Sequence, residues 1–173
     1  MSIKLSKEQI KDIRHLQKNL DIRVRELNNI SMDEDLTLEK YIALKTEVFE
    51  FVNEIESFKY WKKKKGKDHI LEEACDTLHF IFSIAIDKDV ELLDMDEVLG
   101  ENYNPDNYEF NDLIGVMDAM ISDCYIENSW EGLNSVLMIL CILLDKCNFN
   151  ADDLYKAYID KNKVNHDRQS SNY

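Results

Sequence analysis

The chain has 173 residues and a formal net charge of −14 at pH 7, and a length of this order predicts one domain, or two at most. Hydrophobic residues make up 45% of the sequence, which is enough for a packed core. The acidic excess argues against a general nucleic-acid-binding protein, which needs clustered Lys and Arg. A divalent metal would still allow a small phosphorylated ligand to bind.

No segment predicts export or membrane insertion. Residues 1–17 are amphipathic and charged, without the apolar core of a signal peptide. The longest apolar run, 135–144, is too short and too interrupted to span a membrane. The four cysteines form no CxxC pair and have no His at zinc-ligand spacing. We therefore expect reduced core thiols in a cytoplasmic protein.

Apolar residues recur at three- and four-residue steps along most of the chain, which predicts an all-α fold. The expected helices cover approximately 7–27, 38–61, 69–87, 110–127, 129–147 and 151–165. Ser6, Thr37 and Asp68 are the expected N-caps of the first three. We expect a single domain over 1–173, a helical bundle of about six to seven helices built round a four-helix core.

Two segments depart from the helical pattern. Residues 88–109 contain the single Pro and many acids, which predicts a partly helical start followed by an irregular connector. The polar tail, 166–173, is expected to be mobile without ligand.

Two successive helices each carry a pair of carboxylates at i, i+3 spacing. Glu47 and Glu50 fall along one border of an apolar stripe. Glu73 and Asp76 lie on a helix that is apolar nearly all round, where charges need a partner or a metal. A short loop predicts that the two helices pack antiparallel, so the four carboxylates are expected to converge. Oxygen ligands favour Mg²⁺, with Mn²⁺ as a substitute.

Two other interpretations of these carboxylates have to be weighed. The chain has 35 acidic residues, so i, i+3 pairs arise by chance, and ordinary acidic helices are the simplest alternative. A di-iron site needs a Glu-x-x-His on each of two helices. The sequence approaches that pattern once, where His79 follows Asp76 by three residues, and this disfavours di-iron chemistry.

The same segments resemble a known family. TEVFEFVNEIESFKYW (46–61) and ILEEACDTLHFIFSIAI (70–86) are similar to the dimeric, all-α dUTPases, within the all-α nucleoside triphosphate pyrophosphohydrolases that include the MazG-like proteins. Gln17 in the first helix also fits. A third matching segment contains Tyr158, Lys161, Asn165, Arg168, Gln169 and Tyr173. Segment 88–150 matches no motif and is interpreted as a variable insert.

The sequence departs from the family pattern at three places. Thr77 and Ala85 stand where the family commonly has Gly, and the chain ends in Asn172-Tyr173 instead of Gly-Tyr. These are packing or hinge positions, so they bear on details of activity and not on membership of the family.

The resemblance implies a set of roles. The implied metal ligands are Glu47, Glu50, Glu73 and Asp76, and Glu47 or Glu50 would also activate water. The implied substrate-binding residues are Gln17, Lys59, Trp61, His79, Lys161, Asn165 and Arg168. Within this set, Gln17 would read the uracil edge, with Trp61 and His79 near the deoxyuridine. Lys59 would contact phosphate or sugar, and the last three residues would close over the phosphates.

The implied function is Mg²⁺-dependent hydrolysis of dUTP to dUMP and pyrophosphate by a homodimer, and the expected small-molecule substrate is dUTP or dUDP. Some members of the family are phage-encoded, in which case the host cytoplasm is the expected location. One alternative is a related pyrophosphatase with another base preference. A second is a scaffold whose 88–150 region binds a regulatory protein, and a third is a helical bundle with no site. Nucleic acid and membranes are not expected partners.

Overall fold

The structure is a computed structural model that describes residues 4–63, 69–93 and 104–170. Over these ranges the chain is helical and contains no strand, so the prediction of an all-α bundle is confirmed. The elements are α1 (Lys7–Leu27), α2 (Thr37–Ile55), α3 (Ile70–Asp87), the 3₁₀ helix η1 (Pro105–Asn107), α5 (Phe110–Ile126), the 3₁₀ helix η2 (Trp130–Gly132), α6 (Leu133–Lys146) and α7 (Ala151–Ser170).

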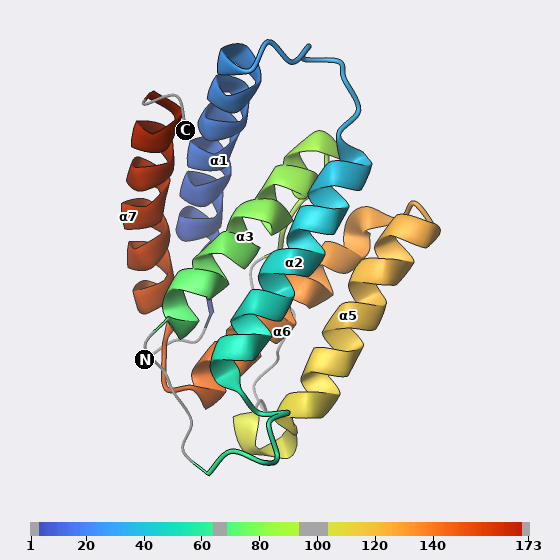
Figure 1. The fold of residues 1–173 in the computed structure, drawn as a ribbon, viewed down its shortest axis with the longest axis vertical. Helices are drawn as coiled ribbons and strands as arrows, with labels where there is room; N and C mark the ends of the chain where they lie inside the picture. The colour runs from blue at the N-terminus through green and yellow to red at the C-terminus, as the bar shows by residue number, and fades with distance from the viewer. Residues whose placement is uncertain (1–3, 64–68, 94–103, 171–173) are drawn as a thin grey trace.

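Helix α3 lies at the centre of the bundle. It packs against α1, α2, α6 and α7, with α1 and α7 on one side of it and α2, α5 and α6 on the other (Figure 1). Most of its residues are buried, as expected for a helix that is apolar nearly all round. Helix α2 runs antiparallel to α3 (Figure 1), so the two carboxylate-bearing helices lie side by side as the sequence predicts.

The ends of the first three helices only partly match the prediction. Ser6 caps α1 in a reciprocal capping box with Gln9, as expected. The prediction that the second helix reaches residue 61 is wrong, because Glu56 adopts a left-handed conformation (φ 58°) and α2 ends at Ile55. Leu36, and not Thr37, is its N-cap. The predicted cap at residue 68 lies outside the described ranges.

The C-terminal helix is longer than predicted. Helix α7 continues to Ser170, beyond its predicted end at about residue 165. The mobility expected for the tail 166–173 stays a prediction, and the last three residues lie outside the described ranges. No Gly or Pro interrupts this segment, and α7 packs along α1 and α3. Tertiary packing therefore carries a polar sequence through about one further turn.

The region 88–150 contributes to the core. Its expected connector is described only as far as residue 93 and again from 104, where η1 interrupts irregular chain. The helix predicted over 129–147 begins instead as η2, anchored by the buried Trp130, and continues as α6. Most side chains of α6 are buried. The interpretation of 88–150 as a variable insert stays a prediction.

Two further expectations concern membranes and cysteines. Among the described residues, no single helix has the length and apolar character to cross a membrane. The segments Trp130–Lys146 and Ala151–Gln169 are long and apolar enough only when they are taken together, and the chain bends by 109° between them. The four cysteines all lie in the described ranges, are buried and form no disulfide, as the prediction of core thiols requires.

Candidate metal and nucleotide site

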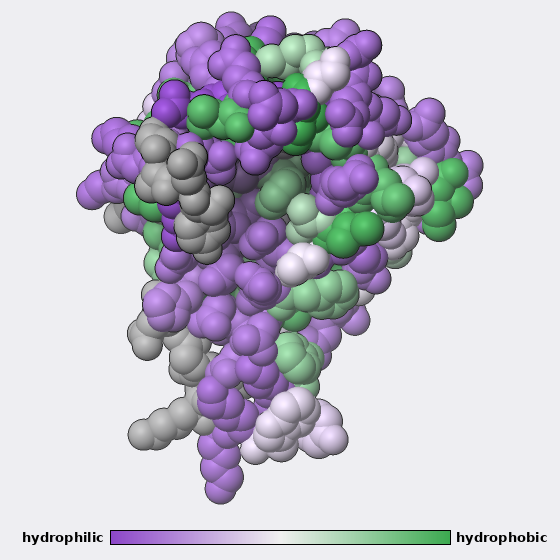
Figure 2. All heavy atoms as spheres, turned by 45° about the horizontal axis from the view of Figure 1, so that its top comes forward, coloured by the Kyte–Doolittle hydropathy of each residue, from purple (hydrophilic) through white to green (hydrophobic). Residues whose placement is uncertain are grey.

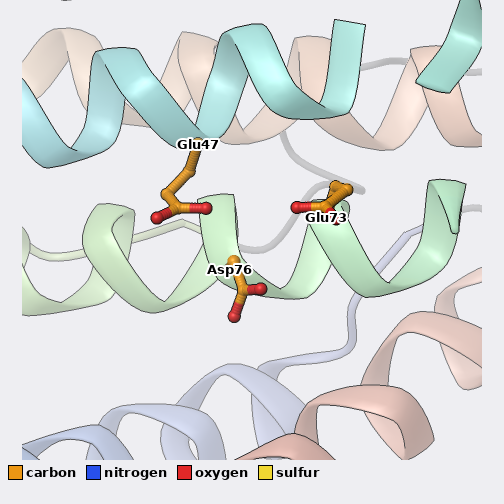
Figure 3. Close-up of side chains that lie close together, drawn as sticks. All are labelled: Glu47, Glu73 and Asp76. Carbon is orange, nitrogen blue, oxygen red and sulfur yellow. The ribbon is translucent and has the colours of Figure 1, made fainter. Parts of the chain in front are cut away.

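Three carboxylates meet where α2 crosses α3. Glu47 from α2 and Glu73 and Asp76 from α3 each offer an oxygen, and these oxygens lie within 4.8 Å of one another (Figure 3). Glu73 and Asp76 are one turn apart on α3, and the antiparallel packing of α2 brings Glu47 beside them. All three side chains are partly buried.

The cluster concentrates negative charge. Burial, followed by the neighbouring charges of Asp76, Glu50 and Glu73, raises the pKa of Glu47 to about 7. Burial and the same kind of repulsion raise the pKa of Glu73. Lys161 of α7 offsets part of this charge, since its ammonium lies 2.8 Å from a carboxylate oxygen of Asp76. A divalent cation with oxygen ligands would relieve the remaining repulsion, so the donor set fits Mg²⁺.

Glu50, the fourth predicted ligand, lies outside this three-carboxylate cluster. Its side chain is exposed and lines a neighbouring surface pocket together with Asn53, Glu54 and Glu73. It is still close enough for its charge to raise the pKa of Glu47 and of Glu73. A four-carboxylate site therefore stays a prediction.

A pocket of about 490 Å³ opens beside the cluster. It is formed by α1, α2, α3 and α7, and Asp76 belongs both to its wall and to the cluster. The other wall residues are Gln17, Leu20, Asp21, Val24, Leu36, Glu39, Lys40, Ala43, His79, Phe80, Ser83, Asn165, Arg168 and Gln169. The structure thus brings five of the seven predicted substrate-binding residues to one place: Gln17, His79, Asn165 and Arg168 in the wall, and Lys161 at the cluster.

A buried hydrogen-bond network holds the deep side of this pocket. The Tyr158 hydroxyl donates to Gln17 Oε1 at 2.8 Å, and His79 Nδ1 lies 2.6 Å from the same oxygen. Gln17 Nε2 donates to Asp21 Oδ1 at 2.7 Å, and the Ser83 hydroxyl donates to Asp21 Oδ2 at 2.8 Å. The network links α1, α3 and α7, so it fixes side chains that are far apart in the sequence.

Burial decides the charge states in this network. Burial, with a smaller contribution from Lys161, lowers the pKa of His79 to about 3, so the imidazole is neutral. Burial also raises the pKa of Asp21, although Lys40, 3.7 Å away, opposes that shift. The pocket therefore presents a neutral ring beside an ion pair.

The sequence interpretation missed Asp21 and Ser83 as site residues. Asp21 follows Gln17 by one turn on α1, and Ser83 follows His79 by one turn on α3. Polar residues at i, i+4 beside a predicted site residue share its helix face, and this spacing was the available signal.

Lys59 and Trp61 lie elsewhere. The Lys59 ammonium is 2.9 Å from Glu56 Oε1 and 3.2 Å from the Asn53 carbonyl oxygen. Trp61 is 66% exposed and meets Tyr60 edge-to-face. Neither residue lines the pocket within this chain, because both follow the end of α2. Their roles toward substrate stay predictions.

Comparison with known proteins agrees with this geometry. A sequence model described as dUTPase matches residues 9–173, a range that contains both helices of the cluster and every wall residue of the pocket. A search of curated proteins gave no match. Because the family match spans nearly the whole chain and the described ranges are mainly helical and contain no strand, the chain belongs to the dUTPase family, in an all-α form.

Proposed function

We propose that the protein hydrolyses dUTP to dUMP and pyrophosphate with the help of Mg²⁺. One observation carries the proposal: Asp76 is shared by a cluster of three carboxylates and by a pocket of about 490 Å³. A metal site that opens directly into a nucleotide-sized pocket suits phosphate chemistry on a bound nucleotide. The family match supports the same activity.

Glu47, Glu73 and Asp76 would hold the metal, and Mn²⁺ would substitute for Mg²⁺ because both accept oxygen ligands. When bound, Mg²⁺ supplies charge that neutralises the triphosphate and acidifies water. The Lys161 ammonium forms an ion pair with Asp76. It therefore lies where it would attract phosphate oxygens. Arg168 in the pocket wall offers a planar guanidinium for the same purpose. The base and sugar would then occupy the part of the pocket near Gln17 and His79.

A carboxylate on α2 takes the proton from the attacking water. Glu47 lies inside the cluster and Glu50 lies one turn further on, at its edge. The two assignments separate in a Glu50→Gln variant. Loss of turnover with unchanged Mn²⁺ affinity identifies Glu50 as the general base. Loss of both identifies it as a fourth metal ligand, and retention of both leaves Glu47 as the base.

The direct test is pyrophosphate release from dUTP with Mg²⁺ and with EDTA. We expect Asp76→Asn to remove the activity. Glu72→Gln is a matched control, because Glu72 is on the same helix and pairs with the same Lys161 but lies outside the cluster. Activity of a folded Asp76→Asn protein close to wild type would refute the metal assignment. A panel of other deoxynucleoside triphosphates tests the base preference.

We also infer a homodimer. Helices α2 and α5 carry exposed apolar side chains, with exposed fractions of 54% for Ile42, 50% for Phe49, 51% for Val116 and 71% for Ile126. Hydrophobic residues gather on the right of Figure 2, the side on which α5 lies in Figure 1. An apolar surface of this kind favours association. Sedimentation of wild type and of an Ile42→Lys variant tests the proposal, since a dimer through this surface would dissociate in the variant.

A further inference from the structure

A basic side chain reaches the carboxylate cluster from α7. The Lys161 ammonium lies 2.8 Å from Asp76 Oδ2 and 3.0 Å from Glu72 Oε1, and only 14% of this side chain is exposed. In Figure 3, Asp76 points away from α2, to the side of α3 on which α1 and α7 lie. Asp76 is therefore the member of the cluster that a side chain from α7 can reach.

This ammonium offsets part of the charge of the whole cluster. Burial raises the pKa of Glu47 and of Glu73, the neighbouring carboxylates raise both further, and Lys161 opposes both shifts. Its charge therefore acts on all three members of the cluster, although its ion pair is with Asp76. A cation in this position stabilises carboxylates that would otherwise repel one another.

A divalent ion and the Lys161 ammonium compete for Asp76. An ion held by Glu47, Glu73 and Asp76 would face the ammonium across a single carboxylate, and like charges at that separation repel. An ammonium has three N–H donors, and Lys161 directs one of them to Glu72, which lies outside the cluster. Glu72 can therefore retain the side chain after Asp76 has become a metal ligand.

We propose that Lys161 is the resident cation of the metal-free cluster, and that its ammonium leaves Asp76 when a divalent ion binds while its ion pair with Glu72 remains. This proposal rests on the proposed function and concerns the regulation of its metal site. Lys161 shares a face of α7 with Asn165 and Arg168 of the pocket wall, at i, i+4 and i+7. The N–H donors that Lys161 withdraws from Asp76 thus become available to phosphate only once the metal site is filled.

The first experiment measures metal affinity without nucleotide, from the electron paramagnetic resonance signal of free Mn²⁺. We expect Lys161→Met to bind Mn²⁺ about tenfold more tightly than wild type, because the competing charge is lost. Lys163→Met is the matched control: Lys163 is an exposed residue of the same helix, and the variant loses the same charge. We expect it to change the affinity by less than about twofold, since exposed charges are screened. A folded Lys161→Met protein that binds Mn²⁺ no more tightly than wild type would overturn the proposal.

The second experiment observes the displacement in the wild-type protein by NMR with ¹⁵N and ¹³C labels. In EDTA, we expect the Lys161 ammonium nitrogen to show couplings across hydrogen bonds to the carboxyl carbons of both Asp76 and Glu72. Saturating Mg²⁺ should remove the coupling to Asp76 and leave the coupling to Glu72. A coupling to Asp76 that persists in Mg²⁺, or is absent already in EDTA, would overturn the proposal. The signal is assigned by its loss in Lys161→Met, or in Lys161→Arg if the first variant does not fold.

Failure of the displacement and failure of the proposed function give different results. If neither wild type nor Lys161→Met binds Mn²⁺, the metal site is refuted and the displacement with it. If wild type binds Mn²⁺ and releases pyrophosphate with Mg²⁺, but Lys161→Met has the wild-type affinity, the displacement alone is overturned. If Mg²⁺ removes the Asp76 coupling in a protein that releases no pyrophosphate from dUTP, the proposed reaction fails and the displacement stands.

Discussion

Glu47→Gln should make the metal-free protein more stable at pH 8. The pKa of Glu47 is raised from 4.5 to about 7 by burial and by the carboxylates around it. The folded state therefore binds this proton more tightly than the unfolded state does. As the pH rises from about 4.5 to 7, the free energy of unfolding falls, and above that window the full penalty of the charged carboxylate is present. Gln has nearly the shape of protonated Glu and carries no charge.

The magnitude follows from the shift. At about 1.36 kcal/mol per pH unit, the change from 4.5 to about 7 corresponds to roughly 3 kcal/mol. Glu47 is only half-buried, and solvent screening reduces this figure to about 1–2 kcal/mol. We expect Glu47→Gln to exceed wild type by that amount at pH 8 in EDTA, with a much smaller difference at pH 5.

Urea unfolding at both pH values, followed by circular dichroism, measures the difference. Glu26→Gln, an exposed position on α1, is the control and should change stability by less than about 0.5 kcal/mol. Mg²⁺ should stabilise wild type and have little effect on Glu47→Gln, because the variant loses a ligand. If Glu47→Gln is no more stable than wild type at pH 8 without metal, the electrostatic account of the cluster is wrong.

Four further predictions concern two glycines, the cysteines and His79. Gly115→Ala should stabilise the protein by about 0.5–1 kcal/mol, because a Cβ there meets nothing within 4 Å in the middle of α5. Gly132→Ala should destabilise it by about 1–3 kcal/mol, because its Cβ would lie 2.7 Å from Cys124 Sγ; a smaller cost in a Cys124→Ala background would confirm the cause, and an equal cost would exclude it. Thiol titration should find no fast-reacting cysteine in the native protein and four after unfolding, since all four are buried; one fast native thiol contradicts this. His79, with a pKa of about 3, should remain neutral from pH 8 down to pH 5 by NMR, and a titration near pH 6.5 would contradict the burial argument.

Local patterns in the sequence determine the helices of this protein. The three- and four-residue apolar spacing predicts α1, α3 and α5 closely, and the Ser6 capping box predicts the start of α1. These features depend on neighbouring residues, so they can be read from the sequence alone. The end of α2 at Ile55 could not be predicted from the sequence, because it depends on the left-handed conformation of Glu56. Glu is a residue type that usually continues a helix.

The sequence also places two carboxylate pairs on adjacent helices, but only the tertiary structure decides which members meet. Residues three apart on a helix differ by about 60° around its axis. That rotation turns Glu47 toward α3 and leaves Glu50 on the exposed flank. The spacing of residues in the sequence cannot show which of the two faces α3, because packing against neighbouring helices sets the rotation of α2 about its own axis.

The pocket depends still more on tertiary structure. Gln17 meets His79 across 62 positions of the sequence and Tyr158 across 141. The family resemblance implies that the first two lie near the substrate. Their hydrogen bonds to each other and to Tyr158 depend on how α7 packs against α1 and α3. Local sequence thus determines which helices form and which carry charge. The packing of those helices decides which charges converge and which side chains are neutral.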